Sequence, residues 1–266
     1  MALTETITSP RNPLLREIAR AAARGTLTEE GGLCLAEGLH LLEEALSSER
    51  TVPAVVCSES TRNVMVRRLH GLKRLRLAVV PDALFAKLST TESPQGVMAL
   101  VKPPVWSFDN IFRARPLVAV LDGLQDPGNA GAIVRAAEAF GATGVIFLKG
   151  SVSPWNPKTM RASAGSLFRL PVMNALDPEV ALAAFAQRRV KLFAALPHGG
   201  LPAHEQDLMR PCGIVIGSEG RGVSAAMAAA CEPIRIATAG VESLNASVAA
   251  AVLLYEASSQ RRLGRK

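Results

Sequence analysis

The chain has 266 residues, of which 48% are hydrophobic, and this length suits one large domain or two modest ones. Its 30 Lys and Arg residues against 23 Asp and Glu residues give a formal net charge of +7, which favours a polyanionic partner such as nucleic acid. The four cysteines form no C-x-x-C pair and no metal-ligand spacing with the four histidines, and no apolar run approaches the ~18 residues that cross a bilayer. We therefore expect reduced thiols, no metal and no membrane span, and the absence of a secretory pattern in MALTETITSP predicts a cytoplasmic protein.

The first hundred residues alternate between helical and strand-like patterns. NPLLREIARAAAR predicts a basic helix, LCLAEG a short strand, and LHLLEEALSS a second helix. Strand-like runs follow at 52–57, 75–80 and 97–102, and the helical segment TRNVMVRRLHGL separates the first two. This order predicts an α/β domain over residues 1–102. The segment KPPVWSFDNIFRARP has three prolines and no clear period, so we place a linker at 103–115.

The alternation restarts after the linker. A strand PLVAVLD leads into a helix NAGAIVRAAEAFG and a strand GVIFLK, and further strand candidates are RLPVM, VKLFAAL, CGIVIG and PIRIA. Strands that alternate with helices predict a parallel sheet in a second domain, 116–266. A long apolar helix within LNASVAAAVLLYEASSQRRLGRK is expected to pack on that sheet.

Three loops of the second domain follow predicted strands, where open parallel sheets bind ligands. The first, LDGLQDPGNAGAIVR, places Asn129 to cap a helix and Arg135 six residues later. The second, IVIGSEGRGVS, is rich in glycine, which lets backbone approach a ligand closely. The third, IATAGVESLNASV, leads through small residues into the terminal helix. Taken singly, each loop is also explained by a helix cap or a tight turn, and none has a nucleoside-triphosphate or dinucleotide motif.

Together, the three loops resemble the three motifs of the SpoU (TrmH) group of SPOUT RNA methyltransferases, in order and in spacing. The first motif, Asn followed six residues later by Arg, is matched by Asn129 and Arg135; the second, G-x-E-x-x-G, is matched by Gly217, Glu219 and Gly222. The third, S-L-N-x-S-V-A, is matched by residues 243–249. The resemblance covers essentially all of 116–262, including the connecting segment WNPKTMRASAGSLFRLPV.

The resemblance implies a fold, a reaction and a set of site residues. The fold is an α/β sheet tied in a trefoil knot, and the reaction is transfer of a methyl group from S-adenosylmethionine to a ribose 2′-hydroxyl of RNA. By matching positions, the cofactor contacts are Ala195, Leu196, Gly217, Ile236 and Leu244. The catalytic group is Arg135, Asn129, Glu219, Ser243 and Asn245, in which Asn129 orients Arg135. Family members are thought to use the arginine as the base, but a guanidinium normally stays protonated, so we favour stabilisation of the developing alkoxide or anchoring of a phosphate.

The N-terminal domain is similar to the substrate-binding domain of ribosomal-RNA members, which resembles an RNA-binding ribosomal protein. The resemblance rests on ITSPRNPLLREI, LCLAEGLHLLEEAL and TESPQGVMALV. RNA contacts are predicted at Arg11 and Asn12 in the first of these segments, and at Trp155, Lys158 and Arg161 in the connecting segment. The family completes its active site across a dimer, so a homodimer is expected, with the terminal helix as an interface element or as intramolecular core.

Two rival functions stay open at this point. A non-catalytic RNA-binding or ribosome-assembly protein would keep the fold without the reaction, but the intact motif residues argue against it. A transfer-RNA methyltransferase usually has short helical extensions, so the 1–102 domain favours large-subunit (23S-type) ribosomal RNA. The target nucleotide, and whether its modification is housekeeping or confers antibiotic resistance, do not follow from the sequence.

Overall fold

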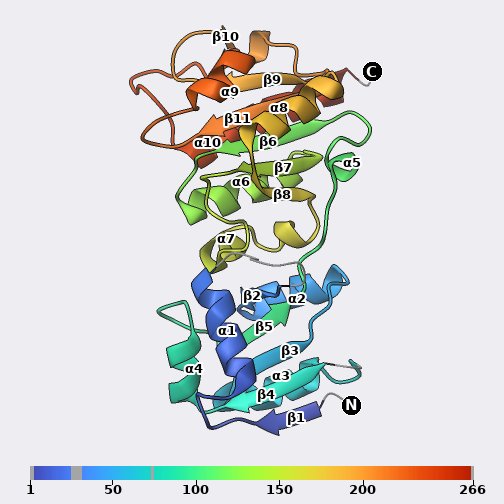
Figure 1. Cartoon of the computed structure of the whole chain (residues 1–266), viewed down its shortest axis with the longest axis vertical. Helices are drawn as coiled ribbons and strands as arrows, with labels where there is room; N and C mark the ends of the chain where they lie inside the picture. The colour runs from blue at the N-terminus through green and yellow to red at the C-terminus, as the bar shows by residue number, and fades with distance from the viewer. Residues whose placement is uncertain (1–2, 25–31, 73–74, 265–266) are drawn as a thin grey trace. The chain divides into compact units, whose positions relative to one another are not determined.

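The computed structural model describes residues 3–24, 32–72 and 75–264, and these fall into two compact units (Figure 1). Unit 1 comprises Met1–Pro104 together with Trp155–Phe168, and unit 2 comprises Val105–Pro154 together with Arg169–Lys266. The domain ranges 1–102 and 116–266 predicted from the sequence are continuous, whereas the compact units are not. Residues 155–168 lie between two strands of unit 2 in sequence but pack within unit 1.

Unit 1 is built on a five-stranded mixed sheet with the strand order β1-β4-β3-β5-β2 (Figure 1). β4 is parallel to β1 and β3, while β5 is antiparallel to β3 and β2. The strands are β1 (Leu3–Thr6), β2 (Cys34–Glu37), β3 (Ala54–Ser58), β4 (Arg76–Val80) and β5 (Val97–Val101). The helices are α1 (Pro13–Arg24), α2 (Leu39–Ser47), α3 (Arg62–Arg68), α4 (Asp82–Leu88) and α7 (Pro157–Ala162). The predicted elements of 1–102 are present, and β1 and α4 are additions.

The core of unit 1 forms where the apolar face of α1 meets the sheet. Leu14, Leu15 and Ile18 recur at helical spacing, are buried, and pack with Phe85 of α4 against the strands. Asn12 fixes the start of α1, because its Oδ1 accepts a hydrogen bond from the backbone N–H of Leu14 at 2.9 Å. Because the apolar face of α1 packs on the sheet, its charged face is exposed to solvent.

Unit 2 has a seven-stranded sheet with the order β10-β12-β9-β11-β6-β7-β8, and every pair in it is parallel. The parallel sheet predicted from the sequence is confirmed. Its strands are β6 (Leu117–Asp122), β7 (Gly144–Leu148), β8 (Val172–Leu176), β9 (Lys191–Ala195), β10 (Leu201–Pro202), β11 (Cys212–Gly217) and β12 (Glu232–Arg235). Its helices are α5 (Phe108–Ile111), α6 (Pro127–Ala139), α8 (Pro178–Gln187), α9 (Ala225–Ala230) and α10 (Ala246–Leu263).

Helices cover both faces of this sheet, as buried parallel strands require. On one face, Ile111 of α5, Phe185 of α8 and Met227 of α9 pack on alternate residues of β6, β7 and β11. On the other face α6 and α10 pack against each other and against the sheet (Figure 1). Among the helices that the structure describes, none is both long and apolar enough to span a bilayer. The trefoil knot implied by the resemblance stays a prediction.

Arg261, near the end of α10, anchors that helix to the amino-terminal ends of β6 and β11. Its guanidinium donates hydrogen bonds of 2.7–3.0 Å to four backbone carbonyl oxygens, which belong to Arg115, Pro116, Leu208 and Arg210. Burial lowers its pKa from the usual value. One charged group thus bonds to carbonyls of two separate loops. Arg261 therefore holds together the edge of the unit 2 sheet at which β6 and β11 begin.

We expect Arg261→Met to reduce the free energy of unfolding of unit 2 by about 3 kcal/mol, because it leaves partly buried carbonyls without donors. Urea denaturation measures the change. Arg262→Met is the matched control, since the Arg262 side chain is exposed and donates to the backbone carbonyl of Ser258 at 3.4 Å, within its own helix; its effect should stay within about 0.5 kcal/mol. Equal losses in the two variants would contradict the anchoring role.

Candidate active site

A cavity of about 410 Å³ lies at the carboxyl ends of β9, β11 and β12, closed by the loop that precedes α10. This is the edge of a parallel sheet where ligands bind, and the volume lies in the range of cofactor sites. Its walls combine apolar side chains, among them Leu196 and Ile236, with the carboxylates of Glu219 and Glu242. An apolar pocket with two acidic groups suits a ligand that is part aromatic and part cationic.

Every residue predicted to contact the cofactor lines this one cavity. They come from four separate places: the end of β9, the end of β11, the residue after β12 and the loop before α10. They are Ala195, Leu196, Gly217, Ile236 and Leu244. The cavity is also lined by four further residues of the second and third family motifs: Glu219, Gly222, Ser243 and Asn245. The sequence analysis did not single out Glu242, which adds an exposed carboxylate and sits one residue before the third motif.

Gly217 is required by close approach of two backbone segments in the second motif. The loop closes on itself, because Ser218 and Gly222 exchange backbone hydrogen bonds of 3.1 and 2.8 Å. A Cβ atom added at Gly217 would lie 2.1 Å from the carbonyl carbon of Gly222 and 2.2 Å from the amide nitrogen of Val223. No side chain fits in that space, so glycine is the residue that allows this wall of the cavity to form.

The three motifs meet in a directional chain of hydrogen bonds. Asn245 caps α10, since its Oδ1 accepts from the backbone N–H groups of Ser247 and Val248 at 2.9 and 3.3 Å. Its Nδ2 therefore faces outward and donates to Oδ1 of Asn129 at 3.1 Å. The Asn129 Nδ2 in turn donates to Oε1 of Glu219 at 2.5 Å. The polarity of the chain is thus set from the helix end to the carboxylate, and it suits an ionised Glu219.

The sequence analysis placed Asn129 as the cap of its helix, and this was wrong. α6 begins two residues earlier, at Pro127, and its cap is Asp126, whose Oδ1 accepts from the backbone N–H of Asn129 at 2.7 Å. Proline favours the first helical position and aspartate is a strong cap, so the earlier start is the better one. The correction matters for the site, because it frees the Asn129 side chain to join Glu219 and Asn245.

Arg135 is exposed on α6, and among the described residues its side chain has no hydrogen-bond or ion-pair partner. The side chain of Asn129 is engaged by Glu219 and Asn245, so the orientation of Arg135 by Asn129 stays a prediction. An exposed guanidinium on the helix that carries Asn129 is available to an anion from outside the chain.

The residues predicted to contact RNA fall into different environments. Arg11 and Lys158 are exposed, while Asn12 caps α1. Trp155 is buried, with 5% of its surface exposed, and Arg161 pairs with Glu37. The structure thus gives Asn12, Trp155 and Arg161 intramolecular partners or packing, and RNA contact by any of the five stays a prediction.

Other reactive groups are placed away from solvent or paired. Burial raises the pKa of Cys34 to about 12 and that of Cys231 to about 11, so both stay protonated thiols at neutral pH. Asp122, at the end of β6, is buried and accepts from the backbone N–H of Ser224 at 2.7 Å, which ties the first loop to the second. Within the described residues, no cluster of His, Cys, Asp and Glu is arranged to hold a metal.

Comparison with known proteins gives two family matches. The SpoU rRNA Methylase family matches residues 116–255, and the MRM3-like substrate binding domain matches residues 12–99.

Individual relatives match over most of the chain. The 23S rRNA (uridine(2479)-2′-O)-methyltransferase of Streptomyces viridochromogenes is 34% identical over 74% of this chain and 71% of its own. The 23S rRNA (guanosine(2553)-2′-O)-methyltransferase RlmP of Bacillus subtilis is 32% identical over 83% of this chain and 86% of its own. Among solved structures, the SpoU methyltransferase AviRb from Streptomyces viridochromogenes in complex with AdoMet superposes with a TM-score of 0.86, at 29% identity, over 95% of this chain and 99% of that one.

Proposed function

Since the chain belongs to the SpoU rRNA methylase family and is an S-adenosylmethionine-dependent RNA methyltransferase, we propose that it methylates a ribose 2′-hydroxyl of large-subunit ribosomal RNA. The observation that carries the proposal is that the second and third motifs line one cavity, and that Asn129 of the first motif is hydrogen-bonded to two of its lining residues, Glu219 and Asn245. The match of 12–99 to a substrate-binding domain supports an extended RNA substrate.

The cavity residues fit the methyl donor. When bound, S-adenosylmethionine supplies a methyl group already activated on a sulfonium. Leu196, Ile236 and Leu244 provide apolar contact for a flat base, and the backbone at Gly217 permits close approach. Glu219 and Glu242 place negative charge where a cationic donor is held.

The protein's own task is then to align the ribose oxygen and to help its proton leave. We assign to Arg135 the stabilisation of the developing alkoxide, or the anchoring of a phosphate beside it, because it carries an exposed positive charge on the helix that also carries Asn129. Glu219, Ser243 and Asn245 shape the pocket between that helix and the donor.

We further propose a homodimer, in which a second copy covers the outer face of α10. Val248, Val252 and Tyr255 recur at i, i+4 and i+7 on that helix and are 48%, 39% and 53% exposed. A row of large apolar side chains on one helical face is typical of an interface. Sedimentation equilibrium should give a mass twice the 28.1 kDa of the chain, and a monomer at micromolar concentration would contradict the dimer.

The substrate assignment is tested by competition among RNAs. Initial rates of methyl transfer are measured with unmodified large-subunit RNA, small-subunit RNA and transfer RNA, and we expect the first to be fastest. Faster transfer to transfer RNA would overturn the ribosomal assignment while keeping the enzyme class. RNA binding without methyl transfer to any of the three would support a non-catalytic role. If ribosomal RNA is the substrate, we expect the protein to act in the cytoplasm.

A further inference from the structure

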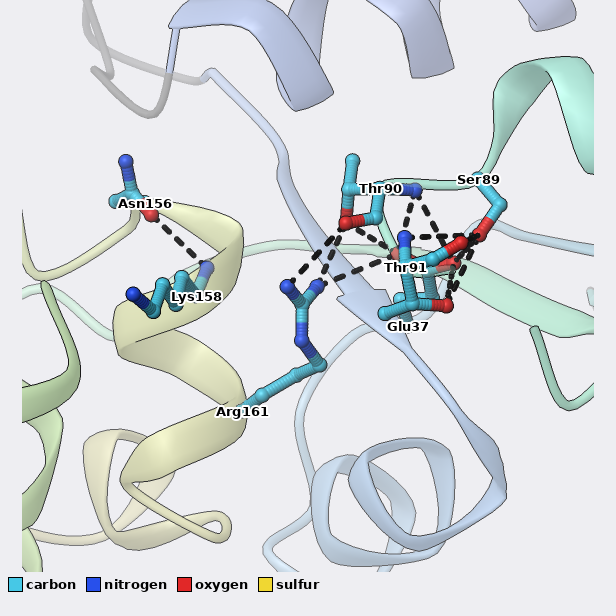
Figure 2. Close-up of polar contacts among 7 residues, drawn as sticks. All are labelled: Glu37, Ser89, Thr90, Thr91, Asn156, Lys158 and Arg161. Atoms are coloured by element: carbon cyan, nitrogen blue, oxygen red, sulfur yellow. Dashed lines mark hydrogen bonds and ion pairs between the residues drawn. The ribbon is translucent and has the colours of Figure 1, made fainter. Parts of the chain in front are cut away.

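Glu37, the last residue of β2, is a buried carboxylate surrounded by donors. Its side chain is 3% exposed. Oε2 accepts from the backbone N–H of Thr90 at 3.0 Å and from the Arg161 guanidinium at 3.3 Å, and the hydroxyls of Ser89 and Thr90 also donate to the carboxylate (Figure 2). Because each of these partners is a donor, the geometry suits the ionised form, which accepts on both oxygens.

Arg161 reaches this carboxylate from α7, as Figure 2 shows. Its guanidinium also donates to the Thr90 hydroxyl at 2.6 Å, so it contacts both Glu37 and Thr90. The side chain is 28% exposed, which leaves it shielded from bulk water. Removal of Arg161 from such a pair is costly, because Glu37 is then left buried without its opposite charge.

A second contact holds the same segment. The backbone at Gly165 packs so closely on α2 that an added Cβ would lie 2.6 Å from the Glu44 side chain. Met160, Leu167 and Phe168 of this segment are fully buried. The segment 155–168 is therefore a packed part of unit 1, although it belongs in sequence to the connection between β7 and β8 of the catalytic sheet.

We propose that Glu37 and Arg161 are positioning residues for the methyl-transfer reaction: their ion pair fastens residues 155–168 of the β7–β8 connection into unit 1, so that the two chain links between this segment and the catalytic sheet stay short. The connection is short on both sides, since residues 149–154 precede the segment and 169–171 follow it. When the ion pair is removed, the β7–β8 connection becomes more mobile and the reacting atoms are less well aligned. Misalignment of reacting atoms lowers the rate of methyl transfer more than the affinity for the substrate. The inference rests on the proposed function.

Direct contact of Arg161 with an RNA phosphate predicts different effects of substitutions at Arg161 and at Glu37. If Arg161 bound RNA directly, Arg161→Met would weaken RNA binding, whereas removal of the neighbouring negative charge by Glu37→Gln would leave it unchanged or strengthen it. If the two residues act as a pair, Glu37→Gln and Arg161→Met should have the same effect, and the double variant should be no worse than either single variant. Lys158→Met is the comparison for direct RNA contact, because it removes an exposed cation of the same short helix that is itself predicted to contact RNA.

The experiment measures kcat, RNA affinity and S-adenosylmethionine affinity for the wild type, Glu37→Gln, Arg161→Met, the double variant and Lys158→Met. We expect about a tenfold fall in kcat for the first three variants, with RNA and S-adenosylmethionine affinities within about twofold of wild type. Arg161→Lys should recover part of the rate, since it keeps the charge but loses the planar fork. A wild-type kcat in Glu37→Gln, or a fall in RNA affinity shared by Arg161→Met and Lys158→Met, would overturn the proposal.

Amide hydrogen exchange provides a readout that does not need activity. Exchange at 155–168 and 89–91 should be at least about tenfold faster in Arg161→Met and Glu37→Gln than in wild type. Equal exchange would overturn the proposed fastening even if the enzyme were active. Absence of methyl transfer by the wild type would instead refute the proposed function, and the exchange measurement would still decide whether the pair holds the segment.

Discussion

Replacing Gly217 by alanine is expected to weaken S-adenosylmethionine binding at least about a hundredfold, equivalent to about 2.7 kcal/mol. The added methyl would fall 2.1 Å from the backbone of Gly222, and backbone cannot yield as a flexible side chain can. The turn held by Ser218 and Gly222 must therefore open, and with it one wall of the cavity. Calorimetric titration with S-adenosylmethionine measures the loss.

Gly220→Ala is the matched control, because it lies in the same loop and its Cβ would meet nothing within 4 Å. We expect it to bind the cofactor within about twofold of wild type. Comparable losses in the two variants would mean that the whole loop is sensitive to any added bulk, and would contradict the specific close approach at Gly217.

Asn129→Asp should lower kcat about a hundredfold, since it replaces a donor by a carboxylate directly opposite Glu219. Two carboxylates at that separation cannot both stay ionised in contact, so one takes up a proton or the pair separates. The hydrogen-bonded chain from Asn245 to Glu219 is then broken in the middle. Single-turnover methyl transfer measures the loss without interference from product release.

A compensating double variant tests the reason for that loss. Asn129→Asp combined with Glu219→Gln restores a donor opposite an acceptor and keeps the net charge of the pair. We expect it to recover at least about tenfold in rate over Asn129→Asp alone. If nothing is recovered while the double variant remains folded, then the polarity of the chain is not what matters, and the charge on Glu219 itself carries the role.

Strands and most of the helices of unit 2 follow from local sequence, because buried parallel strands appear as short apolar runs between turn residues. PLVAVLD and CGIVIG are such runs, and both became central strands, β6 and β11. β1 has the sequence LTET, which contains one apolar residue and no apolar run. Its strand conformation therefore depends on pairing with β4 rather than on its own sequence pattern. α4, of seven residues, is too short for a reliable helical period.

The candidate site also has features that the sequence predicts and features that it does not. The residues predicted to contact the cofactor came from the family resemblance, and the structure brings them together in one cavity at one sheet edge, whose lining residue Glu242 was not predicted. The cap of α6 was misplaced by three residues because Asn129 and Asp126 are both good caps, and Pro127, which favours the first helical position, decides for Asp126.

Contacts between distant parts of the chain leave no local signal. Arg161 and Glu37 are 124 residues apart, and each looks like an ordinary surface charge in its own segment. Burial of Glu37 is set by the loop that contains Thr90, and no spacing within LCLAEG shows this. An arginine in a basic chain is naturally interpreted as an RNA contact, and the pairing of Arg161 with a buried carboxylate appears only in the structure.

The most direct test of the account is methyl transfer from labelled S-adenosylmethionine to unmodified large-subunit RNA by the wild type and by Arg135→Ala. The account predicts label at a ribose 2′-oxygen, seen as resistance of one phosphodiester to alkali, and a fall of at least about a thousandfold in the variant with cofactor affinity retained. Label on a base, no label with the wild type, or equal rates in the two proteins would contradict it.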